Sequence, residues 1–182
     1  FAGRTALVLY EAPVYSGDQL EVAACPPHSA PQRAGIVRRK VTAHLVHART
    51  HEGLQVATPA SAWAMVARQL TVRELIVVGD ALVRVPRDDH GILLPERQLA
   101  TIEQLLTAAT AGQRKGSAKL LDALDHIRVG SASPLESEFR LDAAAAGLPE
   151  PDLDVEIRDG SGRLLGISEV VYARQRTVVE IE

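Results

Sequence analysis

The chain lacks several features that define large classes of protein. It has one cysteine, Cys25, among 182 residues, so neither an internal disulfide nor a cysteine-based zinc motif can form. No apolar run approaches the roughly 20 residues that a membrane-spanning helix needs, and no basic-then-apolar stretch resembles a secretion signal. Walker, dinucleotide-binding and nucleophile-elbow motifs are also missing. We therefore expect a cytoplasmic globular protein that does not associate with a membrane.

Net charge is small, at −3, but it is unevenly distributed. In residues 133–182 acidic side chains outnumber arginines 11 to 5, whereas residues 1–57 carry six bases and four acids. Any attraction to DNA must therefore be local rather than a property of the whole chain. The sequence begins with Phe1 and stops at Glu182 within an alternating apolar run, so we expect further residues at both ends.

The periodicity of the apolar residues predicts an α+β protein. Alternation at 18–25, 35–41 and 43–48 predicts a small antiparallel sheet, with a loop forced by prolines after the first strand and a polar turn at 49–53. Helical spacing then predicts a bundle. Its helices are expected to begin at Thr58-Pro59, at Thr71 with Glu74 in capping-box register, near Pro95, and at Ser117.

The pattern changes after residues 129–132. A helix is predicted from Ser133 to Ala146, ending at Gly147. A hairpin with its turn at 159–162 follows, and then a last strand at 177–182. We expect residues 131–182 to form a compact α/β unit, incomplete at its C-terminus, after a sheet and helical region at 1–130. Few apolar contacts should cross the junction between them.

Acidic residues on the C-terminal strands are the first candidate site. A carboxylate on a core strand costs free energy unless it is paired or binds a cation. Glu180 and Glu182 share one face of their strand, and antiparallel pairing would bring Glu169 close to Glu180. Because carboxylate oxygens are preferred ligands of Mg²⁺, the pattern predicts that Glu169 and Glu180 bind Mg²⁺ (or Mn²⁺). Glu136 and Glu182 would assist in metal-dependent hydrolysis.

Each acid also has a purely structural interpretation. Glu136 lies three residues after Ser133, so it would close a capping box, and Arg140 one turn later would be its ion-pair partner. Glu169 would be a surface position on a strand. Glu180 and Glu182 would line a solvated edge of the sheet.

Two segments resemble known families. The order Ser133-Pro134-Leu135-Glu136, a hairpin, Glu169-Val170-Val171-Tyr172 and Val178-Val179-Glu180-Ile181-Glu182 resembles the Vsr-like branch of the restriction-endonuclease superfamily, the PD-(D/E)XK nucleases. This resemblance implies a restriction-endonuclease-like fold, with Glu136, Glu169 and Glu180 at active-site positions and Glu182 near the place of the superfamily's lysine. The second resemblance is carried by the strand pair, by Gly53-Leu54-Gln55-Val56-Ala57-Thr58-Pro59-Ala60, by the Trp63 helix and by Leu75 to Leu82 with Asp80. Through these, residues 1–85 resemble the region that follows the winged helix in AbiEi-type antitoxins, which implies a DNA-binding winged helix before or overlapping Phe1.

Basic residues form the second candidate site. Arg33, Arg38, Arg39 and Lys40, here called the basic band, are followed by His44, His47 and Arg49, and together they would contact DNA phosphates. The alternative is a solvated sheet face.

The leading interpretation is a metal-dependent DNA endonuclease. The main rival is a non-catalytic DNA-binding regulator, or a toxin-antitoxin-type protein with a degenerate nuclease fold. The rival is favoured because no lysine follows Glu180. A third hypothesis is a protein-interaction module that uses the acidic C-terminal face.

Overall fold

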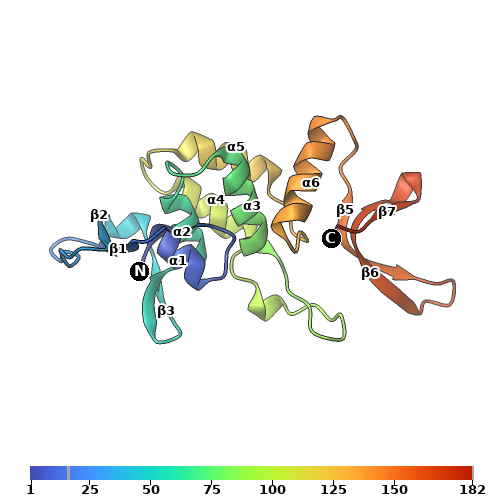
Figure 1. The fold of residues 1–182 in the computed structure, drawn as a ribbon, viewed down its shortest axis with the longest axis horizontal. Coiled ribbons are helices and arrows are strands. Elements are labelled where there is room, and N and C mark those ends of the chain that lie inside the picture. Colours follow the sequence, from blue (N-terminus) through green and yellow to red (C-terminus); the bar gives the residue numbers. More distant parts are fainter. Residues whose placement is uncertain (16, 182) are drawn as a thin grey trace.

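A computed structural model describes residues 1–15 and 17–181, and in this part the chain is mixed α and β. Figure 1 shows the sheet β1–β2 and the sheet β5–β7 toward opposite ends of the long axis, with helices between them. The elements, in chain order, are α1 (Gly3–Leu9), β1 (Leu20–Ala24), β2 (Ile36–Lys40), η1 (Ala43–Leu45), β3 (Ala48–His51), β4 (Leu54–Ala57), α2 (Pro59–Met65), α3 (Val72–Val83), η2 (Pro95–Arg97), α4 (Ile102–Thr110), α5 (Ser117–His126), α6 (Pro134–Ala145), β5 (Asp152–Arg158), β6 (Leu164–Tyr172), η3 (Ala173–Gln175) and β7 (Thr177–Val179). None of the described helices is long and apolar enough to cross a membrane.

The predicted N-terminal antiparallel sheet is only partly correct. β1 and β2 are parallel, with Leu20 beside Ile36, because the loop 25–35 is long enough to carry the chain back to the start of the next strand. The predicted strand at 43–48 is wrong, since residues 43–45 form the turn η1. Most of the predicted turn at 49–53 is strand, leaving Glu52 and Gly53 as the turn of the antiparallel β3–β4 hairpin. Both of these residues have positive φ, as such two-residue turns require.

The predicted helix starts are largely confirmed by their caps. The Thr58 side chain accepts a hydrogen bond from the backbone of Ser61, with Pro59 at the first helical position. Thr71 and Glu74 form both hydrogen bonds of the capping box that begins α3. The third helix starts later than predicted, because Thr101 caps α4 and Pro95 belongs to the separate turn η2.

One apolar cluster occupies the helical part of the molecule. Trp63 is fully buried, and its indole Nε1 donates to the backbone oxygen of Leu75 at 2.9 Å. The largest other fully buried members come from α1, α3, α4 and α5 and from the end of α5: Leu7, Leu75, Leu82, Leu105, Leu120 and Ile127. From α6 onward only the partly buried Leu141 joins the described cluster. This cluster therefore lies almost wholly before residue 128, and the buried Val170, Val171 and Tyr172 of β6 are outside it.

Polar contacts join α6 to this helical core. The buried Asp80 carboxylate on α3 accepts hydrogen bonds from Ser137 Oγ at 2.7 Å, Arg140 Nη2 at 2.8 Å and the Arg128 backbone at 2.8 Å. Arg73 on α3 pairs with Glu138 and Asp142 on α6. The expected ion pair between Glu136 and Arg140 is therefore wrong, because Arg140 is turned toward α3.

The C-terminal sheet is also attached through charged groups. The Arg87 guanidinium contacts both carboxylate oxygens of Asp154 at 2.9 Å and lies 3.3 Å from Glu156. Arg128 reaches Glu150 at 3.0 Å. The predicted hairpin is present, in the antiparallel order β5–β6–β7, but the last strand is shorter than predicted: it ends at Val179, so Glu180 follows it. The division into 1–130 and 131–182 stays a prediction.

Asp80→Ala should destabilise the protein by about 3–5 kcal/mol, because it leaves the Arg140 charge buried without its partner. Urea unfolding followed by Trp63 fluorescence measures this destabilisation. Arg163→Ala is the control, since Arg163 is 76% exposed in its pair with Asp159 and should cost less than about 1 kcal/mol. Equal destabilisation in the two variants would contradict the importance of the buried pair.

Candidate functional site

Glu136 lies in the first turn of α6 and is 2% exposed. Its Oε2 accepts a hydrogen bond from the Ala132 backbone at 2.7 Å, and its own backbone N–H donates to Ser133 Oγ at 3.2 Å. Glu136 therefore acts as part of the helix cap. Burial raises the pKa of its carboxyl group, hydrogen bonds from the Ala132 backbone and the Ser133 side chain oppose this shift, and the nearby charge of Glu169 raises the pKa further.

Glu169 and Glu180 have separate hydrogen-bond donors. Glu169 Oε2 on β6 accepts from the Ile181 backbone at 2.7 Å, and Glu180 Oε1 accepts from Ser168 Oγ at 2.7 Å. Neighbouring side chains on a strand point to opposite faces, so the bond to Ser168 directs the Glu180 carboxylate away from the Glu169 side. Glu182 lies outside the described residues.

The expected cluster of three carboxylates around one ion is not formed within residues 1–15 and 17–181. In that part of the chain, no three His, Cys, Asp or Glu side chains are grouped so that they could hold a metal. Carboxylate oxygens have the right chemistry for Mg²⁺, but Glu136, Glu169 and Glu180 are each bound to a donor of the protein. In this arrangement they do not fit a magnesium ion, although Glu136 and Glu169 are close enough to interact electrostatically.

The basic band is divided between the two faces of β2. Arg38 and Lys40 are exposed and two residues apart, so they share one face, and Arg33 is exposed in the preceding loop. Arg39 points the other way and pairs with the buried Glu21 carboxylate at 2.7 Å. Among the described residues, Arg33, Arg38 and Lys40 have no acidic partner within ion-pair distance.

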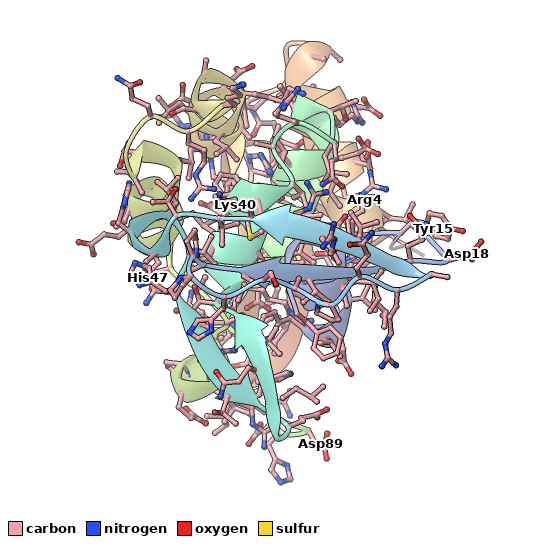
Figure 2. All side chains as sticks on the ribbon, turned by 90° about the vertical axis from the view of Figure 1, so that its left-hand side faces the viewer. Arg4, Tyr15, Asp18, Lys40, His47 and Asp89 are labelled. Carbon is pink, nitrogen blue, oxygen red and sulfur yellow. The ribbon has the colours of Figure 1, made fainter. Side chains whose placement is uncertain are left out.

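The strand β2 borders an open hollow. Arg38, Arg39 and Lys40 line a cavity of about 430 Å³ together with the loop that holds His28. Figure 2 looks onto β1 and β2 and shows Lys40 and His47 toward one side of this face and Asp18 toward the other. The positive charge therefore collects near the C-terminal end of β2.

The residues expected to extend this band lie elsewhere. The Arg49 guanidinium lies 4.8 Å from the centre of the Tyr10 ring, and its Nε donates to the Tyr10 hydroxyl at 3.1 Å. His44 and His47 line a separate cavity of about 410 Å³ against α4. Arg49 therefore packs against Tyr10. Among the described residues, the remaining candidates for contact with DNA phosphates are Arg33, Arg38 and Lys40.

A third cavity was not predicted. It measures about 530 Å³ and is bordered by the end of α1, the β3–β4 turn, the end of α3 and the start of α6. Arg84 and Arg97 are among the residues that line it. Sequence spacing gives no sign of this site, because its walls come from segments that are far apart in the chain.

Comparison with protein families, with curated proteins and with solved structures finds no match to this chain. The Vsr-like and AbiEi-like resemblances therefore rest on their motifs alone. The function has to be argued from the residues.

The Glu136 carboxyl should make stability depend on pH in a defined direction. Its pKa is higher in the folded than in the unfolded state, so the stability it contributes is present below the unfolded value near 4.5 and is lost as pH rises through the folded value. Glu136→Gln removes this penalty and still offers an oxygen to Ala132. Relative to wild type, the variant should gain stability between about pH 4 and pH 7, measured by urea unfolding.

Glu74→Gln is the matched control, with the opposite sign. Hydrogen bonds from the Thr71 backbone and side chain lower the pKa of Glu74, so its contribution is present above the unfolded value and is lost as pH falls. Relative to wild type, this variant should lose stability as pH rises toward the unfolded value near 4.5 from below, with no further loss at higher pH. A shift of the same sign in both variants would contradict the assignment.

Proposed function

We propose that this protein is a non-catalytic DNA-binding regulator of the toxin-antitoxin type, acting in the cytoplasm. The observation that carries the proposal is the unneutralised charge of Arg38 and Lys40 on the exposed face of β2, with Arg33 beside them in the loop. Cationic side chains without acidic partners release counterions when they meet DNA phosphates, and this release favours binding. A local site of this kind is compatible with a net charge of −3.

The state of the carboxylates supports a regulator rather than an enzyme. Glu136 caps a helix, Glu169 binds the backbone of Ile181, and Glu180 binds Ser168. A metal ion would have to replace these donors. Glu182 stands near the place that a catalytic lysine takes in the superfamily that this segment resembles.

Removing the exposed charges of β2 should weaken DNA binding in a salt-dependent way. For Arg38→Gln combined with Lys40→Gln, we expect the slope of log K against log salt to fall by about 0.9 for each DNA phosphate that the variant no longer neutralises. Fluorescence anisotropy with a labelled duplex, at salt concentrations from about 50 to about 300 mM, measures this slope.

Arg174→Gln combined with Arg176→Gln is the charge-matched control. These arginines are exposed in and after η3, next to the C-terminal sheet rather than β2 (Figure 1). The control should keep the wild-type slope. If the slope falls equally in both double variants, binding follows net charge and the assignment to β2 is wrong.

Metal-dependent DNA cleavage is a second candidate, and one observation favours it. The Glu136 carboxylate is buried within electrostatic reach of Glu169, an arrangement that raises the pKa of Glu136. Two acids held near each other in this way are often functional. Cleavage would require them to exchange their present hydrogen bonds for an ion.

A nicking assay separates the two candidates. The full-length protein is incubated with supercoiled or mismatched DNA and Mg²⁺ or Mn²⁺, alongside Glu169→Gln and Glu180→Gln, which remove one ligand charge and keep the side-chain shape. The regulator proposal predicts no nicking by any of the three, while all three bind DNA. Metal-dependent nicking by wild type that is absent in both variants would establish the nuclease instead.

A further inference from the structure

The 530 Å³ cavity, called here the junction cavity, lies between the helical core and the start of α6. The end of α1 contributes Glu11, the β3–β4 turn contributes Glu52, and α6 and the residues before it contribute Ser131 and Ser133. Its volume falls within the range of about 300–1,000 Å³ typical of small-molecule sites. No residue of β2 lines it, so this site is separate from the basic band.

Two arginines give the junction cavity an anion-binding character. Arg84 follows α3 directly and Arg97 lies in η2, and both line the cavity. Within residues 1–15 and 17–181, neither guanidinium has a carboxylate within ion-pair distance. Arginine presents several donors in a planar fork that suits the oxygens of a phosphate group. These two side chains therefore have guanidinium donors that could bind an anion.

A buried hydroxyl provides independent evidence for a ligand. Ser131 is 2% exposed, lines the junction cavity, and its Oγ has no hydrogen-bond partner in the described part of the chain. A buried polar atom left without a partner destabilises the folded state. Ser131 also lies just before the N-terminus of the 12-residue helix α6, where the backbone dipole favours negative charge. Glu136 uses one donor there, the Ala132 N–H, and leaves the Ser131 hydroxyl unpaired.

The remaining walls suit the rest of a nucleotide. Leu9, Val77 and Leu99 supply apolar surface, and Glu11 and Glu52 supply carboxylates that can accept hydrogen bonds from sugar hydroxyls. These two acids offset the charge of the two arginines, so an anion would be bound by short-range contacts rather than by attraction from a distance.

We propose that the junction cavity binds a nucleoside monophosphate ester, free or at the 5′ end of a DNA strand, with the phosphate held by Arg84, Arg97 and the Ser131 hydroxyl. Because its walls come from both the helical core and the start of α6, the ligand holds these parts together. Binding to the folded state alone then raises the melting temperature as ligand is added.

Calorimetric titration of the whole chain tests the site. The probes are AMP, adenosine, and two oligonucleotides of one sequence that carry either a 5′ phosphate or a 5′ hydroxyl. We expect AMP to bind at least about tenfold more tightly than adenosine, the difference expected for one hydrogen bond to a charged group. Tight binding of only the 5′-phosphorylated oligonucleotide would support the site and assign the ligand to a strand end. Binding of neither phosphate ester would overturn the proposal.

Three variants locate the ligand. Arg97→Gln should weaken AMP binding at least about tenfold. Ser131→Ala should also weaken it, and because this change removes a hydroxyl that has no partner, it should leave the melting temperature of the free protein unchanged or higher. Arg174→Gln, exposed in η3 and outside the junction cavity, should leave AMP binding unchanged. If Arg97→Gln and Ser131→Ala bind AMP as wild type does, the junction cavity is not the site, whatever the result of the DNA-binding experiments.

Discussion

The buried carboxylate of Asp80 is the constraint on which the arrangement of the chain depends. It is 0% exposed in the last turn of α3, where an unpaired charge would cost several kcal/mol. Ser137, Arg140 and the Arg128 backbone supply the three donors that compensate it. Two of these donors are on α6 and the third is in the segment that leads to it. The hydrogen bonds to the Asp80 carboxylate therefore hold α6 against α3. The position of α6 in turn determines where Glu136 lies and forms one wall of the junction cavity.

The two halves of the molecule are stabilised by different forces. The helical half buries Trp63 and a continuous set of aliphatic side chains, whose stabilisation grows with the apolar area removed from water. From α6 onward the attachment to that half depends mainly on ion pairs, among them Arg73 with Asp142 and Arg87 with Asp154. Such interactions are directional, and they can be broken without opening the apolar core. The attachment of the C-terminal sheet is therefore more open to regulation than the packing around Trp63.

Sequence signals predicted structure only where all the interacting residues lie close together in the chain. The capping box of Thr71 and Glu74 depends on a single helical turn, so the sequence contains all the information that it needs. The parallel pairing of β1 and β2 could not be predicted, because alternation is the same for either direction of the partner strand. Helical spacing predicted an ion pair between Arg140 and Glu136, but Arg140 is buried against Asp80, 60 positions away in the sequence. The junction cavity combines five segments that lie far apart in the chain, so no sequence motif could have predicted it.

The acids and the bases of the chain are best considered as separate sites. The basic band is on β2, and the three described carboxylates are on α6 and the C-terminal strands, toward the other end of the long axis (Figure 1). The exposed charges of β2 are screened from groups at the other end of the molecule at physiological salt. Any phosphate bound beside Glu136 must therefore be held by groups near Glu136. Arg84 is such a group: its positive charge lowers the pKa of the Glu136 carboxyl, against the effect of burial. The junction cavity, which Arg84 lines, is thus the place where this chain brings an arginine close to its buried acid.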